Sequence, residues 1–451
     1  MKSRKLLSLL VVGIVALAGC GKDDPAPEPV LEPGTIPAEI TSSITLTSDR
    51  VWFLKGASYV KSGGVLNIEA GTIIKSDVTQ KGALVIDKGG RIEALGTAER
   101  PIVFTSGRAA NDRNPGDWAG ITIIGRATTN RSSVGNIEGG LTGTYGLETI
   151  DNDNSGTMRY VRIEYAGVSV GLGDEVNALS LYAVGSGTTL DHIMISYAKD
   201  DAYEFFGGTV NGKYLISYGT SDDDFDFDNG YNGKLQFGVV LRLPEYVDVT
   251  DAGNGIECNN ESSLPTTGPS LPLTNPRISN FTFAGTNGAT GEKELHNLAA
   301  RFRVATRFAL NNSILIGFKK GGLGIESGQT AQSYLDGTSV FKNNLVHAMT
   351  APYKIGDASA QALLTAVTTQ TKAEANGCVT LAASADAKLG SPFNLTSPDF
   401  KPQAGSPALS GTWVSPDGST FFTSVNYRGA FSSTDTWANG WTNFNPNAAT
   451  Y

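Results

Sequence analysis

The amino-acid sequence predicts an all-β protein built as a solenoid of short stacked coils. Glycine supplies 54 of the 451 residues, about 12%, where ordinary proteins contain about 7%. After residue 40 no long stretch shows the apolar periodicity of a helix; short apolar strands recur at close intervals instead, separated by Gly, Asn and Asp. A coil so short cannot bury its apolar face alone, so successive coils must stack to form a core.

Strands are expected at the apolar runs that punctuate the chain. Residues 66–71 (LNIEAG) are followed by the similar run 84–89 (LVIDKG), and shorter runs stand at 102–104 and 121–124. Further on, a motif of Ile, one other residue, Tyr and a small residue occurs three times, at 163–166, 195–198 and 216–219. The offset between the last two copies also separates Asn211-Gly212 from Asn232-Gly233, which predicts one register for this part of the chain.

Three later segments look like equivalent turns that lead into strands. They are 279–281 (SNF), 312–314 (NSI) and 343–345 (NNL), at nearly equal spacings. Neighbouring coils of a solenoid lie about 4.8 Å apart, so residues at equivalent positions stack on one another. We therefore expect Asn side chains at such turns to form hydrogen-bonded ladders.

Composition and charge exclude several other classes of protein. The chain is 40% hydrophobic and 18% charged, which is too apolar for a wholly disordered protein. A net charge of -9 argues against a nucleic-acid binder, which needs a basic surface. Three cysteines are too few for a disulfide framework. A β-propeller would repeat every ~40–45 residues, and the sequence shows no such period.

The solenoid resembles a known family at three places. Residues 101–106 (PIVFTS) with 116–121 (GDWAGI) resemble a coil pair of bacterial right-handed parallel β-helix proteins of the pectate-lyase-like superfamily. Residues 398–409 resemble the segment that closes many of these helices, and 427–441 resemble the tail of Bacteroidota β-helix lipoproteins. The resemblance implies a right-handed parallel β-helix with a C-terminal cap. It implies little about activity, because this fold hosts lyases, hydrolases and non-enzymes.

The N-terminus has the features of a bacterial lipoprotein signal peptide. Three basic residues among the first five precede an apolar run at 6–18, which is too short to span a bilayer. The run leads into Leu-Ala-Gly-Cys at 17–20, which matches the bacterial lipobox. We therefore expect residues 1–19 to be removed and Cys20 to carry lipid, with palmitate among its acyl chains.

The segment after Cys20 indicates where the protein resides. Lys22-Asp23-Asp24 resembles the surface-export signal of Bacteroidota lipoproteins, and five prolines between residues 21 and 40 predict an extended tether. We expect a lipid-anchored protein of the bacterial outer membrane that is exposed at the cell surface. Its first partner is then outer-membrane lipid, held through Cys20.

These features divide the chain into four parts. Residues 1–19 form the signal peptide, 20–40 the lipidated cysteine and Pro-rich acidic tether, 41–410 the parallel β-helix, and 411–451 a C-terminal cap. A cap is expected because the exposed end of a solenoid would pair with other chains. Loops are predicted at 107–116, 128–157 and 244–276, and the Ala-rich stretch 358–375 predicts a short helix.

The strongest chemical signal is an alternating acidic run at 222–229 (DDDFDFDN). In a strand its two Phe rings point one way, and Asp224, Asp226 and Asp228 point the other, about 7 Å apart. The rings can enter the core, which leaves the three carboxylates on the outer face.

One coil earlier, residues 200–206 (DDAYEFF) have the same character. A one-residue shift aligns their Tyr-Glu-Phe with the Phe-Asp-Phe of the later run. That alignment places Glu204 about 4.8 Å from Asp226.

Carboxylates this close repel, and each raises the pKa of its neighbour unless a cation lies among them. Calcium suits such a set because it takes about 6–8 oxygen ligands in flexible geometry. The alternative is a solvated acidic surface that Lys199, Lys213 and Lys234 neutralise. The candidate calcium ligands are Asp200, Asp201, Glu204, Asp222, Asp223, Asp224, Asp226 and Asp228.

Catalysis is the second use of such an acidic ladder. Pectate-lyase-like enzymes hold calcium on stacked acids and use Arg or Lys as the base, so the resemblance implies a calcium-dependent polysaccharide lyase as an alternative. Leu-Asp-His at 190–192 resembles part of a Trp-Ile-Asp-His motif of such lyases, without the Trp. Lys199, Lys213 and Arg242 are nearby basic residues, yet none lies in a recognisable pattern. None of the three histidines has the Gly-His-Gly setting of polygalacturonase-type hydrolases.

Cysteine and tryptophan leave further choices. Cys258 lies in the predicted loop 244–276, and pairing with Cys378 would require their Cα atoms within about 7 Å, so both a disulfide and free thiols stay open. Trp413, Trp437 and Trp441 are expected to fill the cap, with stacking on sugar rings as the alternative.

We expect the protein to bind an extracellular glycan or protein without catalysis. Calcium at the acidic ladder would stiffen the coils between residues 200 and 228. The alternatives are the polysaccharide lyase and an accessory component of an outer-membrane uptake complex. The sequence does not reveal the identity of the ligand.

Overall fold

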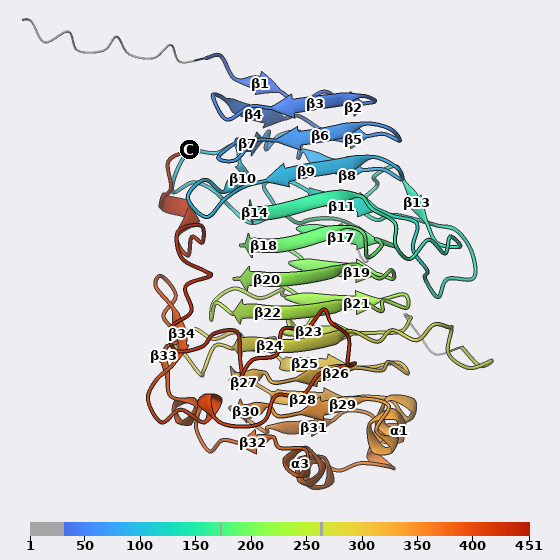
Figure 1. Cartoon of the computed structure of the whole chain (residues 1–451), viewed down its shortest axis with the longest axis vertical. Helices are drawn as coiled ribbons and strands as arrows, with labels where there is room; N and C mark the ends of the chain where they lie inside the picture. Colours follow the sequence, from blue (N-terminus) through green and yellow to red (C-terminus); the bar gives the residue numbers. More distant parts are fainter. Residues whose placement is uncertain (1–30, 172–173, 262–264) are drawn as a thin grey trace, which may run out of the picture. The chain divides into compact units, whose positions relative to one another are not determined.

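The chain forms a right-handed parallel β-helix, seen in a computed structural model that describes residues 31–171, 174–261 and 265–451 (Figure 1). Residues from Glu32 onward make one compact unit. The predicted signal peptide, Cys20 and the first part of the predicted tether lie outside the described residues. Of the helices in these ranges, none combines the length and apolarity needed to cross a bilayer.

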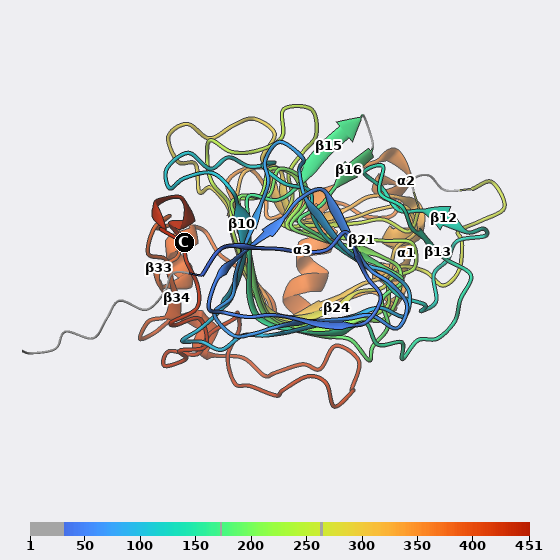
Figure 2. The ribbon, with the colours of Figure 1, turned by 90° about the horizontal axis from the view of Figure 1, so that it is seen from above.

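Two parallel sheets build the walls of the helix, and Figure 2 shows the coils superimposed along its axis. The long sheet has 17 strands: β1 (Gly34–Thr35), β3 (Ser43–Leu46), β4 (Val51–Leu54), β6 (Val65–Ile68), β7 (Ile73–Ser76), β9 (Arg91–Leu95), β10 (Ile102–Ser106), β14 (Gly156–Glu164), β18 (Thr189–Ser196), β20 (Asn211–Tyr218), β22 (Lys234–Leu241), β24 (Arg277–Ala284), β26 (Ala309–Asn311), β27 (Ile314–Phe318), β29 (Val340–Lys342), β30 (Leu345–Ala348) and β32 (Val379–Thr380).

The short sheet has 11 strands, which run opposite the long sheet across the core: β2 (Glu39–Ile40), β5 (Ala57–Val60), β8 (Ala83–Ile86), β11 (Gly120–Ile124), β17 (Leu179–Tyr182), β19 (Tyr203–Phe206), β21 (Phe225–Asp228), β23 (Ile256–Cys258), β25 (Leu298–Phe302), β28 (Gly321–Ile325) and β31 (Tyr353–Ile355). Inward Leu, Ile, Val and Phe side chains from both sheets form the core. Aromatic rings of successive coils stack there, with Tyr203 and Phe225 4.7 Å apart.

Smaller elements surround the coils. Three antiparallel hairpins join β12 (Gly135–Asn136) to β13 (Thr144–Tyr145), β15 (Val168–Gly171) to β16 (Asp174–Val176), and β33 (Leu389–Ser391) to β34 (Asp399–Pro402). The helices are α1 (Gly328–Asp336), α2 (Ala358–Gln361) and α3 (Ala366–Ala375), so the predicted helical stretch 358–375 is confirmed. Three short 3-10 turns lie at Ser384–Ala387, Pro407–Leu409 and Pro446–Ala448.

The long sheet bends sharply where its successive strands β14, β18, β20 and β22 each pass through a residue with positive φ. At Tyr160, His192, Tyr214 and Phe237 the φ angles are 49, 53, 58 and 63°. This left-handed conformation is unfavourable for aromatic residues. Their rings stack from coil to coil, with centroids 4.3, 4.3 and 5.1 Å apart, and the stacking offsets the strain. We call these four residues the aromatic ladder.

Asparagines take over the same bend in the later coils. Asn280, Asn312 and Asn343 have φ of 58, 54 and 56°, and Asn tolerates this conformation better than most residues. The Asn343 Nδ2 donates to Asn312 Oδ1 at 2.8 Å, and Asn312 Nδ2 donates to Ser279 Oγ at 2.9 Å. The predicted asparagine ladder is therefore confirmed. Its register differs from the predicted one, because Asn280 rather than Ser279 is the residue equivalent to Asn312.

The register predicted for the middle coils is wrong. Ile195 pairs with Ser217 rather than Ile216, and Asn211 pairs with Lys234 rather than Asn232, so both coils are slightly longer than predicted. The slip at Ile195 has a reason in the direction of the side chains, because a shift of one residue reverses the face that each side chain occupies. Leu215 pairs with Ile193 inside the core, whereas Ile216 faces outward.

The segment 411–451, which we call the strap, does not cap the solenoid, and this corrects the prediction for it. Helix α3 packs against β31 and β32 at the end of the coils instead (Figure 1). The strap runs along the side of the helix toward the first coils, where Lys75 Nζ donates to the Tyr451 carbonyl at 2.8 Å. Its aromatic residues cover outward apolar side chains of β18, β20 and β22, which would otherwise face water.

Cys258 does not lie in a loop, which corrects another prediction. It ends strand β23, whose residues pair with Phe225 to Phe227 of β21, and its side chain is fully buried. Cys378 is also buried, and both thiols are free. The predicted loop 244–276 is therefore interrupted by a strand of the short sheet.

Candidate metal-binding site

The acidic ladder forms on the outer face of the short sheet. Strands β19 and β21 pair so that Glu204 lies beside Asp226, as predicted from the alternation. Strand β23 then adds Glu257 beside Asp226. Because Phe225 and Phe227 are fully buried in the core, the intervening carboxylate must face outward.

A second ladder lies at the turn that precedes these strands. The Asn177 Oδ1 accepts the amide N–H of Asp201 at 3.2 Å, Asp201 Oδ1 accepts that of Asp223 at 2.7 Å, and Asp223 Oδ1 accepts that of Asn254 at 2.5 Å. One oxygen of each Asp thus accepts a backbone N–H, as the side-chain oxygen of Asn177 does in the preceding coil. An Asn would carry a neutral NH₂ group at the second position, where each Asp carries a second carboxylate oxygen.

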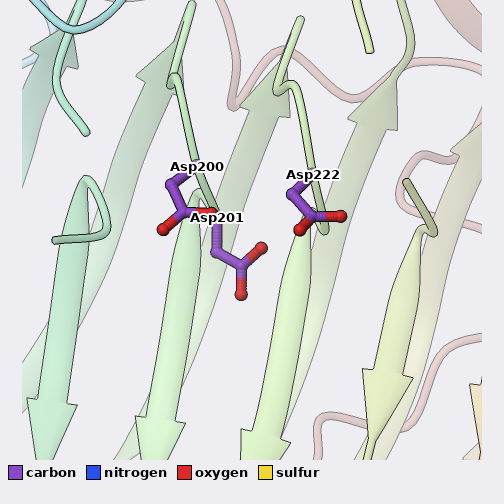
Figure 3. Close-up of side chains that lie close together, drawn as sticks. All are labelled: Asp200, Asp201 and Asp222. Carbon is purple, nitrogen blue, oxygen red and sulfur yellow. The ribbon is translucent and has the colours of Figure 1, made fainter. Parts of the chain in front are cut away.

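The two ladders converge on a cavity of about 170 Å³, which we call the acidic cavity. Ligand oxygens of Asp200, Asp201 and Asp222, which Figure 3 shows, lie within 4.8 Å of one another. The same holds for ligand oxygens of Asp201, Glu204 and Asp226. The lining contains ten carboxylates and one amide: Glu138, Glu175, Asn177, Asp200, Asp201, Glu204, Asp222, Asp223, Asp226, Asp251 and Glu257.

Segments that project from the coils supply three further acids. Glu138 belongs to the β12–β13 hairpin, Glu175 to β16, and Asp251 to the segment between β22 and β23. These segments project beside the short sheet and wall the cavity. Their approach explains how a site on an open sheet face becomes a partly enclosed one.

Burial and mutual repulsion disfavour ionisation of the clustered acids. Burial, followed by Asp251 and Glu257, raises the pKa of Asp222 to about 7. Burial also raises the pKa values of Asp201 and Asp226 well above their usual range, with Asp223 and Glu257 respectively as the leading charged neighbours. Burial and repulsion therefore favour the protonated forms of these acids unless a cation lies among them.

One carboxylate oxygen of this cluster lacks a hydrogen-bond partner within the described residues. The Asp226 Oδ1 is buried and forms no hydrogen bond within the described residues. A buried carboxylate oxygen without a partner is costly, and a bound cation would satisfy it. The donor set, made of carboxylates with one amide oxygen, matches the ligands that calcium prefers.

Two predicted ligands lie elsewhere. Asp224 is fully buried on the inside of the turn, where its Oδ2 is 3.1 Å from Arg242 Nη1 and its Oδ1 accepts a 2.5 Å bond from Ser217. Its prediction as an outward ligand is wrong because β21 begins only at Phe225, so the alternation does not extend to it. Asp228 lines a neighbouring cavity of about 350 Å³ with Arg131, and burial raises its pKa to about 6.

An ion-pair cluster ends the acidic ladder. Arg301 is the next residue in register after Glu257 and donates to it at 2.8 Å, and Arg303 donates to Glu257 at 2.5 Å. Both arginines also pair with Glu326. Burial opposes the ionisation of Glu257, but Arg303 and Arg301 lower its pKa below the usual value. Sequence reasoning missed Glu257 because an irregular segment separates it from Asp226.

The lysines proposed to neutralise the acids do not line the cavity. Lys199 is exposed, Lys213 Nζ donates to Thr423 at 3.0 Å, and Lys234 lies 3.9 Å from Asp417. Strap residues thus contact Lys213 and Lys234, both of which lie on the long sheet.

The residues considered for catalysis are spread over the molecule. Arg242 is 1% exposed and bonds to Asp224 and to backbone carbonyls. His192 stacks in the aromatic ladder, with its Nδ1 2.5 Å from Asp191 Oδ1. His296 Nε2 is 3.0 Å from the Pro244 carbonyl, and burial lowers its pKa to about 3. None of these three side chains lines the acidic cavity.

The tryptophans have different surroundings. Trp441 is fully buried against Tyr160 and His192, and Trp437 is partly buried and stacks on Phe431 at 4.6 Å. They cover the aromatic ladder rather than the end of the solenoid. Trp413 is half-buried in the strap.

Comparison with known proteins assigns the fold to a family. Residues 38–442 match the family model described as a pectate-lyase-like β-helix domain. No curated protein and no solved structure matches the chain. The match covers both the acidic cavity and most of the strap.

Proposed function

The chain belongs to the pectate-lyase-like β-helix family, and on that premise we propose that it is a non-catalytic binding protein whose acidic cavity holds Ca²⁺. The observation that carries the proposal is the convergence of ten carboxylates on about 170 Å³, with Asp226 Oδ1 buried and unpartnered within the described residues. Asp200, Asp201, Glu204, Asp222 and Asp226 are the first candidates to hold the ion. Calcium supplies positive charge where these carboxylates repel one another.

In this proposal the ion makes a binding surface rigid. It neutralises acids of β19 and β21, where Arg301 and Arg303 do not reach, together with acids of three projecting segments, and so ties the segments to the sheet. The ligand we propose is an extracellular glycan or protein that contacts this outer face of the short sheet. The protein is held on the bacterial cell surface by lipid on Cys20, through the Pro-rich tether.

Calorimetric titration of CaCl₂ into the EDTA-treated, lipid-free protein tests the metal site. We expect a single class of heats with a Kd of about 10⁻⁴–10⁻³ M, typical of extracellular calcium modules. The double variant Glu204→Gln/Asp226→Asn should lose these heats. Asp112→Asn, a matched change of an exposed acid, should keep them. A double variant that binds as the parent does would exclude the acidic cavity as the site.

A glycan array, probed with and without EDTA, tests the binding function. We expect retention of one class of glycan that EDTA weakens, without turnover. The anchor is tested separately, since Cys20→Ala should release the protein from membranes into the soluble fraction.

The polysaccharide lyase is the second candidate, and stacked acids of this family support it. It needs a basic side chain beside the ion, whereas Arg242 is buried and Lys213 bonds to the strap. Formation of an unsaturated product that absorbs in the ultraviolet, from an acidic polysaccharide with calcium, would favour the lyase over binding alone. Association with an uptake complex is the third candidate, and co-purification from outer membranes tests it.

A further inference from the structure

Another cavity, larger than the acidic cavity, lies on the other wall of the helix. It measures about 500 Å³, within the range of roughly 300–1,000 Å³ typical of small-molecule sites. Three segments far apart in the sequence build it, namely strands β20 and β22, the β33–β34 hairpin and the strap. We call it the strap cavity, and its lining is Ile216, Val239, Ser391, Ser397, Pro398, Asp399, Phe400, Lys401, Phe431, Asp435, Ala438, Asn439, Gly440, Thr442 and Phe444.

The strap cavity has an apolar floor. Ile216 and Val239 project outward from the long sheet and are almost fully buried. Phe400 of β34 and Phe431 of the strap stack at 6.1 Å with an interplanar angle of 11°. Phe400 and Phe431 are also buried, so packing restricts both rings and each exposes only a small part to the cavity.

Two carboxylates lie at the polar side of the cavity, and each is held by one oxygen. Asp435 Oδ2 accepts bonds from the Tyr427 hydroxyl at 2.9 Å and the Ser432 amide at 2.7 Å. Asp399 Oδ1 accepts the Lys401 amide at 3.1 Å. The second oxygen of each carboxylate receives no hydrogen bond from the described residues, so it can accept one from a ligand.

A glycine makes room for one of these groups. A Cβ atom at Gly390, on the partner strand of the β33–β34 hairpin, would lie 2.2 Å from Asp399 Oδ2. Only glycine therefore permits the observed position of this carboxylate. Close packing against the backbone of β33 therefore restricts the Asp399 carboxylate.

We propose that the strap cavity binds a neutral sugar residue without a metal ion. A pyranose ring has an apolar C–H face, which suits the Phe and aliphatic floor, and an edge of hydroxyl groups, which donate to fixed carboxylate oxygens. Lys401 and Asn439 supply donors to the ring and hydroxyl oxygens.

The charge balance of the cavity selects against other ligands. Asp399 and Asp435 outnumber Lys401, so an acidic sugar would be repelled. The two carboxylates come from separate segments and the floor is apolar, which does not suit a metal ion. The inference extends the proposed binding function to a second site, and it rests on no residue of the acidic cavity.

Titration of the full lipid-free protein in EDTA, followed by saturation-transfer NMR and calorimetry, tests the proposal. The probes are glucose, galactose, mannose, N-acetylglucosamine, lactose and maltose. We expect at least one to bind with a Kd below about 10 mM. Asp399→Asn should weaken that binding roughly tenfold, because a charge-assisted acceptor becomes a neutral one. Asp112→Asn and Glu204→Gln/Asp226→Asn should leave it unchanged.

A second variant separates a loss of binding from a loss of folding. Asn439→Ala removes an exposed side chain, should preserve the melting temperature, and should weaken sugar binding several-fold. The proposal is overturned if no probe binds in EDTA, or if Asp399→Asn and Asn439→Ala both bind as the parent does. Sugar binding that disappears in EDTA and in Glu204→Gln/Asp226→Asn would assign the ligand to the acidic cavity instead.

Discussion

At the bend of the long sheet, Tyr160, His192 and Tyr214 stack with centroids 4.3 Å apart, and Asn343 donates to Asn312 one coil away. On the outer face of the short sheet, Glu204, Asp226 and Glu257 stack in the same parallel register. Parallel coils repeat whatever chemistry a position carries, because equivalent residues must lie side by side. Stacked rings and hydrogen-bonded amides stabilise the fold in such a repeat, whereas stacked carboxylates repel one another.

The difference separates a structural ladder from a functional one. The aromatic and asparagine ladders satisfy their own members and are covered by the strap. Arg301 and Arg303 compensate the acidic ladder only at Glu257. Asp226 keeps a raised pKa and, within the described residues, a buried oxygen without a hydrogen-bond partner. A repeat of like charges that the fold does not neutralise, in a protein whose other ladders are satisfied, indicates a ligand site.

Asp224→Ala should have the largest effect on stability. The variant tests whether the acidic ladder ends before Asp224. Removing this carboxylate leaves Arg242 buried without its charged partner, which should destabilise the fold by about 3–5 kcal/mol. Denaturant unfolding with and without calcium measures it. The loss should be the same in both conditions, and a calcium-dependent loss would return Asp224 to the metal site.

The pH dependence of the calcium effect should be next in size. Asp222 and its neighbours have folded pKa values above the unfolded ones, so the folded protein binds more protons between about pH 4 and 7 and loses stability as pH rises through that window. Calcium binds the ionised forms. At pH 8, calcium at 100 times its Kd should add about 2.7 kcal/mol, and at pH 5 far less.

Melting temperatures at pH 5 and pH 8, each with EDTA, Ca²⁺ or Mg²⁺, measure this dependence. Mg²⁺ serves as the control because it demands stricter geometry and sheds its water reluctantly. A calcium effect of equal size at both pH values would contradict the assignment to acids with raised pKa.

Asn312→Ala tests the structural ladder and should cost about 2 kcal/mol. The change removes bonds to Ser279 and Asn343 and leaves the Val414 carbonyl without its side-chain donor. It also places Ala at a φ of 54°. Calcium should not alter this loss in denaturant unfolding, since the residue belongs to the other sheet. Rescue by calcium would show that the two walls are coupled.

Asp226→Asn should have the smallest effect, with the opposite sign. In EDTA at pH 8 it removes one of several repelling charges and should stabilise the fold by about 1 kcal/mol. With calcium the same variant should gain less from the ion than the parent does. Thermal unfolding of both proteins in both conditions gives the comparison, and destabilisation in EDTA would mean that Asp226 is not held among like charges.

The sequence predicts what is local and periodic in this molecule. The alternation of Phe and Asp was enough to pair Glu204 with Asp226, and glycine content with strand spacing was enough for the solenoid. The sequence did not predict Glu257 as a site residue because the long segment between β21 and β23 follows no period. The inward turn of Asp224 depends on Arg242, a contact that no alternation within one strand can reveal.

The strap also changes how the solenoid behaves as a polymer of coils. In a simple solenoid each coil touches only its neighbours, so fraying can begin at either end and spread. Here Arg428 donates to the Asn343 carbonyl near the last coils, and Lys75 to the Tyr451 carbonyl near the first. The strap thereby links an early coil of the solenoid to a late one. The outward apolar side chains of β18, β20 and β22 therefore stay uncovered during folding until residues 411–451 have packed back onto them.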